Sequence, residues 1–120
     1  MDNHILVVED DAAIREGVRI LLEGEGYIVQ EAEDGYQCLK KVSDDIDLVI
    51  LDIMMPNVDE YTTLAEIRKN DAYRNIKVIF LSAKTGEKDI AKGLELGADA
   101  YVTKPYSIKK LTEQVDNLIK

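Results

Sequence analysis

The 120-residue chain has a single cysteine, no tryptophan and no apolar run long enough to cross a bilayer. Cys38 has no second cysteine to pair with, which excludes an intramolecular disulfide and argues against export to an oxidising compartment. A membrane-spanning helix needs about 20 mostly apolar residues, and the first residues also lack the basic flank of a signal peptide. These absences predict a cytoplasmic protein that does not enter a membrane.

Basic residues are also scarce, since 15 Lys and Arg face 24 Asp and Glu and give a formal net charge of -9. Such a chain repels the DNA backbone, so direct nucleic-acid binding is not expected. No glycine-rich run ends in Gly-Lys-Ser or Gly-Lys-Thr, which excludes a P-loop nucleotide-binding protein. The surplus of carboxylates suits divalent cations, although most of these acids are expected to be solvated surface groups.

Four apolar runs are present, and each leads directly into polar residues. Continuous β-branched and leucine-rich runs are typical of strands buried on both faces in a parallel sheet. In open parallel sheets, the binding site lies beyond the carboxyl ends of the strands. The polar groups are therefore predicted to meet at one edge, where they suit chemistry on a phosphoryl group. The runs and their polar residues are 5–8 with Glu9, Asp10 and Asp11; 48–51 with Asp52; 78–81 with Ser82; and 101–103 with Lys104.

Helical patterns alternate with these strands and predict a doubly wound α/β fold of five βα units, with helices on both faces of the sheet. In the first helix, Ile14, Val18, Leu21 and Leu22 recur at helical spacing, whereas the second is carried mainly by Leu39 and Val42. No repeat or linker interrupts the pattern, so one domain over residues 1–120 is expected. The predicted helices are 12–23, 36–42, 61–69, 87–96 and 108–119, and a further strand is predicted at 28–31.

The acids after the first strand have two interpretations. Carboxylates within one turn raise each other's pKa unless a cation lies among them, and hard oxygen ligands suit Mg²⁺. Alternatively, one of them caps the following helix by accepting backbone N–H groups. For Asp11 we favour the cap, whereas for Asp10 and Glu9 the two interpretations carry equal weight.

Asp52 is either a turn residue or a nucleophile toward phosphorus, because a carboxylate beside a metal can form an acyl phosphate. Lys104 would then supply a compact positive charge to a phosphoryl oxygen, and Ser82 a hydroxyl hydrogen bond. Each signal is weak alone. Their joint placement after separate strands is what favours the phosphoryl interpretation.

With these motifs the chain resembles the receiver domain of two-component response regulators, over essentially all 120 residues. The resemblance implies that Asp52 accepts a phosphoryl group from a phosphohistidine of a sensor histidine kinase or phosphotransfer protein, as a signalling domain and not an enzyme. It also implies a five-stranded, flavodoxin-like sheet in the order 2-1-3-4-5 between two helical layers. The matching residues are Glu9-Asp10, Asp52 with Met55-Pro56, Ser82-Ala83, Gly97-Ala98-Asp99, Tyr101 and Lys104-Pro105.

The resemblance also implies a Mg²⁺ site, with Mn²⁺ as a substitute, formed by Asp10, Asp52 and the backbone carbonyl of Met54, with Glu9 acting through water. Ser82 and Lys104 would contact the phosphoryl oxygens. The Lys104–Pro105 bond would be cis.

Tyr101 is either a packed aromatic residue or, by the resemblance, a rotameric switch coupled to Ser82. The switch would signal through the face formed by the fourth helix, fifth strand and fifth helix to an output domain or partner protein.

Some positions depart from the family pattern. Glu60 stands where Gly is frequent, which predicts a different turn or an earlier start of the third helix. Ala100, Lys110 and Gln114 replace the charged residues through which receivers joined to winged-helix domains dimerise. Those inter-subunit pairs are absent, and the oligomeric state is left open.

Two other functions fit less well. A Mg²⁺-dependent phosphatase with an Asp nucleophile would carry a general acid two residues later, where Met54 cannot donate a proton. A flavodoxin-like binding module should have a Ser/Thr/Gly-rich phosphate loop in place of Glu9, Asp10 and Asp11. Met54 and Lys84 are instead expected to overhang the path of the attacking water and to slow hydrolysis of the acyl phosphate.

Overall fold

The computed structural model describes residues 3–53, 58–82, 86–104 and 107–119. Strands and helices alternate along the chain as expected, and a short 3-10 helix, η1, precedes the fourth strand. The elements are β1 (His4–Val8), α1 (Ala12–Gly24), β2 (Ile28–Ala32), α2 (Gly35–Lys41), β3 (Leu48–Ile53), α3 (Val58–Lys69), η1 (Asp71–Tyr73), β4 (Lys77–Ser82), α4 (Glu87–Glu95), β5 (Ala100–Thr103) and α5 (Ile108–Ile119).

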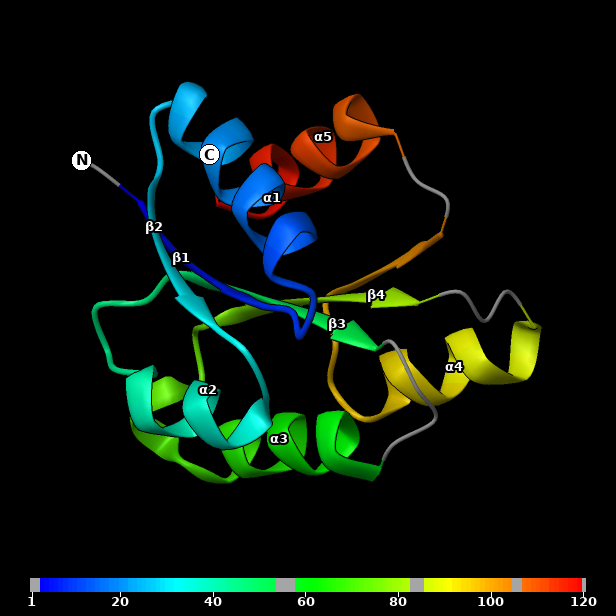
Figure 1. Cartoon of the computed structure of the whole chain (residues 1–120). Coiled ribbons are helices and arrows are strands. Elements are labelled where there is room, and N and C mark those ends of the chain that lie inside the picture. Colours follow the sequence, from blue (N-terminus) through cyan, green and yellow to red (C-terminus); the bar gives the residue numbers. More distant parts are fainter. Residues whose placement is uncertain (1–2, 54–57, 83–85, 105–106, 120) are drawn as a thin grey trace.

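The five strands form one parallel sheet in the order β2-β1-β3-β4-β5. Helices α1 and α5 cover one face of the sheet, and α2, α3 and α4 lie on the other side (Figure 1). This confirms the predicted doubly wound architecture and strand order. All strands run the same way, so their carboxyl ends gather at one edge of the sheet.

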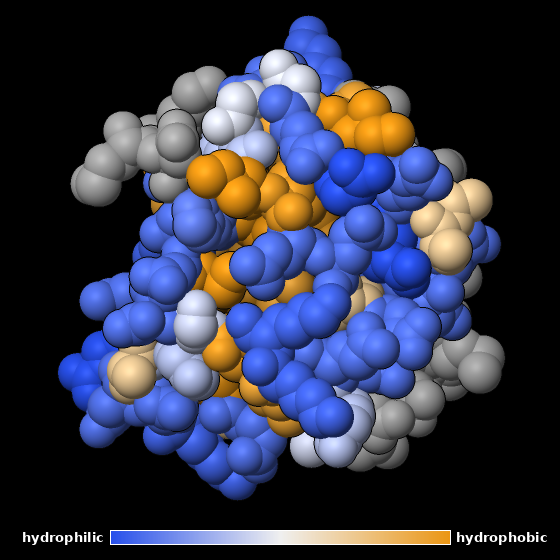
Figure 2. All heavy atoms as spheres, turned by 60° about the vertical axis from the view of Figure 1, so that its left-hand side comes forward, coloured by the Kyte–Doolittle hydropathy of each residue, from blue (hydrophilic) through white to orange (hydrophobic). Residues whose placement is uncertain are grey.

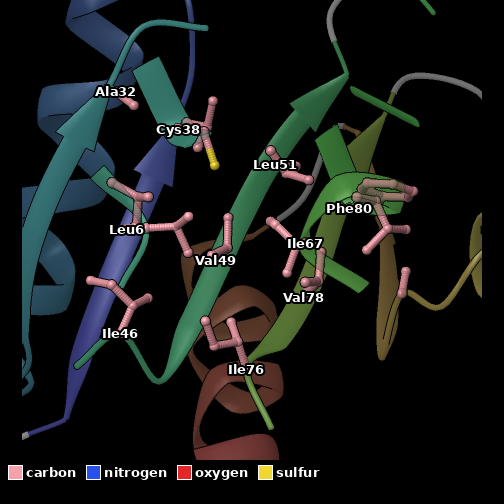
Figure 3. Close-up of a cluster of buried hydrophobic side chains, with 14 residues drawn as sticks. Leu6, Ala32, Cys38, Ile46, Val49, Leu51, Ile67, Ile76, Val78 and Phe80 are labelled. Atoms are coloured by element: carbon pink, nitrogen blue, oxygen red, sulfur yellow. The ribbon is translucent and has the colours of Figure 1, made fainter. Parts of the chain in front are cut away.

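The pleat of the strands divides the core into two clusters, because successive side chains point to opposite faces. In β1, Leu6 and Val8 join the cluster beneath α2 and α3, which Figure 3 shows in close-up. Ile5 and Val7 join the cluster beneath α1 and α5. Residues 5–8 of β1 are buried on both faces of the sheet, which explains their continuous apolar sequence.

The two helices with predicted apolar faces agree with the prediction in part. In α1, Val18 and Leu22 are buried, but Ile14 is 40% exposed. In α2, Leu39 is 37% exposed, so the prediction that it carries the helix was wrong. Cys38 is buried in its place, and it lies four residues before buried Val42, which puts both on one face.

Helix α3 begins at Val58, so Glu60 lies inside the helix. This confirms an earlier helix start, one of the two outcomes predicted for the missing glycine, whereas the turn before Val58 lies outside the described residues. Among the described residues only Gly26 and Gly97 have positive φ. The chain therefore avoids the backbone conformation that a glycine at position 60 would have allowed.

Strand β2 lies at the edge of the sheet and pairs with β1 alone. Its Glu31 carbonyl oxygen accepts a hydrogen bond from Lys41 Nζ at 2.5 Å. Figure 2 shows this side of the molecule, where hydrophilic side chains cover most of the surface and a strip of apolar atoms is visible between them. Within the described part of the chain, no helix is long and apolar enough to span a membrane.

Candidate functional site

The strand register places the predicted site residues at one edge of the sheet. Val8 pairs with Leu51, so Glu9 and Asp52 follow side by side at the ends of β1 and β3. Ser82 ends β4 and pairs with Thr103 at the end of β5. The Lys104 amide donates to the Ser82 carbonyl oxygen at 2.7 Å, which holds the start of the next segment against β4.

Glu9, Asp52 and Lys104 form a group that we call the acidic edge. By the alternation of the pleat, all three continue the face of the sheet that α1 and α5 cover. Lys104 Nζ lies 2.5 Å from Asp52 Oδ1. One ammonium therefore faces two acids that are both almost fully buried.

The carboxylates of the acidic edge lack ordinary hydrogen-bond partners. Glu9 Oε2 and both Asp52 oxygens are buried, and none accepts a hydrogen bond of normal geometry from a described residue. Burial raises the pKa of Glu9 to about 8, assisted by the hydrogen bond that its protonated form gives to Asp52 and by the charge of Asp52. The nearby Lys104 charge lowers the pKa only in part. The two buried acids thus share too little positive charge for both to be ionised.

This shortage is what a divalent cation would correct, so the acids present fit a hard cation such as Mg²⁺. The described residues do not form a closed metal cage, since no three His, Cys, Asp or Glu side chains among them are grouped for one. Magnesium usually keeps several waters and takes one or two carboxylates, so an open site suits it.

The loop between β1 and α1 separates its three acids by role. The Asp11 carboxylate accepts hydrogen bonds from the amides of Ala13 at 2.9 Å and Ile14 at 3.1 Å, which confirms it as the helix cap. Asp10 is exposed, next to the buried Glu9. Arg15 Nη1 donates to the Glu9 carbonyl oxygen at 2.7 Å, a contact that no sequence pattern indicates.

Ser82 and Tyr101 lie on the other face of the sheet. Ser82 is two residues beyond Phe80 in β4, so the two side chains share a face, and the Ser82 side chain is buried. The Tyr101 ring packs edge-on against Phe80, with ring centres 6.4 Å apart. A Cβ atom at Gly93 of α4 would lie 3.0 Å from both rings, so α4 approaches them through bare backbone.

A second polar group, the Arg68 cluster, lies away from the acidic edge. Arg68 of α3 donates to the carbonyl oxygens of Ile76 at 2.7 Å and Gly97 at 2.8 Å, and to Asp99 Oδ2 at 2.9 Å. The same Asp99 oxygen accepts from the Val78 amide at 2.8 Å. Asp99 was singled out as part of a motif, but only the structure shows that it binds Arg68.

Several predicted residues lie outside the described residues. These are Met54 with its carbonyl oxygen, Lys84 and Pro105, together with the predicted cis bond before Pro105. Their roles stay predictions.

The fold is a flavodoxin-like α/β domain, and one edge of its sheet brings two buried acids and a lysine together. The chain belongs to the response regulator receiver domain family, whose sequence model matches residues 5–116. It is thus the receiver domain of a two-component response regulator, a signalling domain. Receiver domains generally bind Mg²⁺ at their phosphorylation site and interact with histidine kinases and output domains.

Individual relatives agree with this assignment. The response regulator SaeR of Staphylococcus aureus is 39% identical over 116 residues, covering 97% of this chain and 50% of SaeR. The chain therefore spans about half the length of the curated relatives it matches. The non-phosphorylated HemR receiver domain of Leptospira biflexa has a TM-score of 0.89 at 28% identity, covering 99% of this chain and 95% of HemR. The chemotaxis response regulator CheY4 of Vibrio cholerae shares the fold, with a TM-score of 0.88 at 24% identity. The match covers 99% of this chain and 100% of the CheY4 chain.

Proposed function

We propose that Asp52 is the phosphoacceptor of this receiver domain and takes its phosphoryl group from a phosphohistidine of a sensor histidine kinase or phosphotransfer protein. The observation that carries the proposal is the Asp52 carboxylate, which is buried at the sheet edge without ordinary hydrogen-bond donors and lies 2.5 Å from the Lys104 ammonium. Apart from Lys104 and the protonated form of Glu9, no described group donates to this carboxylate, so its oxygen lone pairs remain available for attack on phosphorus.

In the proposed reaction an Asp52 oxygen forms a bond to phosphorus while the bond between phosphorus and the histidine nitrogen breaks. The electron pair of that bond returns to the imidazole ring. Lys104 would neutralise charge on the transferred oxygens, and the Ser82 hydroxyl would donate a hydrogen bond to one of them. Neither residue has to move a proton.

The cation site follows from the same residues. Asp10 and Asp52 would hold Mg²⁺ together with the Met54 carbonyl oxygen, and Glu9 would act through water; Mn²⁺ would substitute. When bound, the cation offsets the negative charge that otherwise repels the phosphoryl group. The buried Glu9 and Asp52 oxygens, which share one ammonium and lack other hydrogen-bond donors, support this assignment.

We further propose that phosphorylation is read out on the face formed by α4, β5 and α5. A phosphoryl group on Asp52 would draw Ser82 toward it and allow the Tyr101 ring to turn inward. The close approach of the α4 backbone at Gly93 to the Tyr101 ring supports this coupling, because a turn of the ring would change its packing against α4. The recipient would be an output domain or a partner protein, with residues 1–120 acting as one receiver domain and making no direct nucleic-acid contact.

The phosphoacceptor is tested with a small phosphodonor such as acetyl phosphate in the presence of Mg²⁺. Intact mass should rise by one phosphoryl group, about 80 Da. Asp52→Asn should abolish labelling, because an amide is a poor nucleophile toward phosphorus. Asp11→Asn, which keeps the cap, is the matched control and should be labelled normally. Full labelling of Asp52→Asn would show that Asp52 is not the phosphoacceptor.

The readout is tested with Lys104→Ala. This variant should stay folded and still accept phosphate from the small donor, because Asp52 is unchanged. It should no longer change conformation on phosphorylation, since the ammonium that senses the phosphoryl oxygens is gone. Amide hydrogen exchange over residues 87–104, with and without donor, measures this. A wild-type response in Lys104→Ala would contradict the role.

A further inference from the structure

Arg15 joins three parts of the chain beside the acidic edge. Its Nη1 atom donates to the Glu9 carbonyl oxygen at 2.7 Å, and its Nε atom pairs with Glu31 Oε1 of β2 at 3.0 Å. Its own amide is held in α1 by the Asp11 carbonyl oxygen. One guanidinium thus links the end of β1, the first turns of α1 and the edge strand β2.

The hydrogen bond from Arg15 to the Glu9 carbonyl oxygen fixes the position of the Asp10 backbone. The Glu9 carbonyl group lies in one rigid plane with the amide nitrogen and Cα of Asp10. The Glu9 amide is fixed on its other side, since it donates to the Ala32 carbonyl oxygen at 3.0 Å. Among the described contacts, the Asp10 side chain makes none of its own that would hold it at the edge. Its approach to the cation therefore depends on the peptide plane that precedes it.

We propose that Arg15 is a positioning residue for the cation site, which fixes the Glu9–Asp10 peptide and so aims the Asp10 carboxylate. The inference rests on the proposed function, since it assumes that Asp10 binds Mg²⁺. Groups that orient metal ligands through hydrogen bonds, without contacting the metal themselves, contribute strongly to metal affinity. Arg15 adds such a group to the site without touching the cation.

The positive charge of Arg15 acts in the opposite direction, because it weakens the negative field that attracts a cation. Its partner Glu31 limits that effect. Glu31 Oε2 also pairs with Arg19 Nε at 3.0 Å, and Arg19 in turn reaches Glu23 at 2.8 Å. The charges of these two arginines and two glutamates nearly cancel. The main effect of Arg15 on cation affinity is therefore the orientation of the Glu9–Asp10 peptide.

The comparison of Arg15→Met with Arg19→Met tests the inference. Both variants remove one positive charge and one ion pair to Glu31, but only Arg15 reaches the Glu9 carbonyl oxygen. Mn²⁺ alone is titrated into each protein and followed by the electron paramagnetic resonance of free Mn²⁺. The dissociation constant of Arg15→Met should rise about ten-fold. That of Arg19→Met should stay within about two-fold of wild type, the variation ordinary for a distant surface change.

Labelling by acetyl phosphate separates positioning from general damage. In Arg15→Met the Mg²⁺ concentration for half-maximal rate should rise by the same factor, whereas the rate at saturating Mg²⁺ should approach that of wild type. Arg15→Lys keeps the charge and can donate to the Glu9 carbonyl oxygen, so it should recover part of the affinity. This variant also serves if Arg15→Met does not fold.

Unchanged or tighter Mn²⁺ binding in Arg15→Met would overturn the inference, and so would an equal loss in Arg19→Met. If Arg15→Met does not fold, a dissociation constant of Arg15→Lys between that of wild type and a rise of about ten-fold supports the carbonyl contact. Wild-type affinity in Arg15→Lys, or an equal loss of affinity in Arg19→Met, overturns the inference. Failure of the proposed function looks different, because wild-type protein would then neither bind Mn²⁺ nor be labelled at Asp52.

Discussion

The Arg68 cluster and the acidic edge both hold charged groups partly or fully out of water, in opposite ways. Arg68 donates to two carbonyl oxygens and one carboxylate, and Asp99 accepts from the Val78 amide as well. At the acidic edge, three buried carboxylate oxygens lack ordinary hydrogen bonds, and one ammonium serves two acids.

The difference indicates what each group is for. Hydrogen bonds to charged groups stabilise a fold when both sides are satisfied, and buried polar atoms without partners cost stability. The Arg68 cluster, complete in itself, fastens the loop before β5 to α3 and β4. The acidic edge is incomplete, and in the proposed function a cation and a phosphoryl group would use its remaining bonding capacity.

The largest expected effect comes from breaking the complete group. Arg68→Met should lower the free energy of unfolding by about 3 kcal/mol, because it leaves two carbonyl oxygens and the Asp99 carboxylate short of donors. Asp52→Asn should leave the free energy of unfolding unchanged or raise it, because it removes one of two buried acids that repel each other, and Glu9 can then balance the Lys104 charge. Urea unfolding of both variants without divalent cations makes the comparison. If Asp52→Asn is the more destabilised of the two, the contrast between the groups is wrong.

The second effect is a pH dependence of stability. In the folded protein the pKa of Glu9 is raised to about 8, mainly by burial, from an ordinary value of 4.5. Between these values the folded state holds the proton more firmly, so raising the pH favours unfolding. This contribution to stability is complete below pH 4.5 and is lost as the pH rises through about 8.

One linked proton gives a slope of at most about 1.4 kcal/mol per pH unit. Thermal unfolding of wild type and Glu9→Gln in a metal-free buffer, across this range, should show a shallower decline in the variant. Saturating Mg²⁺ should also flatten the wild-type curve, since the cation replaces the proton as the compensating charge. Parallel curves for the two proteins would exclude Glu9 as the source.

A smaller effect separates the neighbouring acids of the β1–α1 loop. Asp11→Ala should cost about 1 kcal/mol of stability through the lost helix cap and should retain Mg²⁺ binding. Asp10→Ala should lose Mg²⁺ binding and leave stability nearly unchanged. Urea unfolding and Mn²⁺ titration of the two variants measure both quantities. The opposite pairing of results would mean that the roles of the two acids are exchanged.

The smallest effect concerns the lifetime of the phosphoryl group and leaves folding untouched. Met54→Asn should shorten the lifetime several-fold, on the order of 1 kcal/mol in barrier, because an amide can orient the attacking water and a thioether cannot. Decay of the intact-mass signal after removal of the donor measures the rate. An equal or longer lifetime would show that other groups control access to the acyl phosphate.

The architecture was predictable because it depends on periodicity. Buried parallel strands have continuous apolar sequences, and all carboxyl ends meet at one edge, so Asp52 and Lys104 could be expected to approach each other. The cap at Asp11 followed from its place before the first helix. The short helix η1 was missed, because three residues are too few to show a hydrophobic period.

The side-chain contacts that cross the fold were not predictable. Arg68 meets the Gly97 carbonyl oxygen across 29 residues, and nothing in the sequence near either residue indicates the other. From its position in the sequence pattern, Arg15 would be expected to be an ordinary solvated residue of an amphipathic helix. The burial of Glu9 beside an exposed Asp10 likewise depends on the angle at which the chain leaves β1, which no sequence pattern specifies.

The hydrogen bond from Lys41 to the Glu31 carbonyl oxygen has a consequence for the behaviour of the protein at high concentration. An edge strand with open carbonyl and amide groups is a template on which another chain can add a strand and start an aggregate. A second chain that paired with β2 at Glu31 would have to displace the Lys41 ammonium from the Glu31 carbonyl oxygen. The charged group would then either be buried in the new contact or be pushed into solvent. The contact thus helps to prevent a strand of another chain from adding to the sheet at β2.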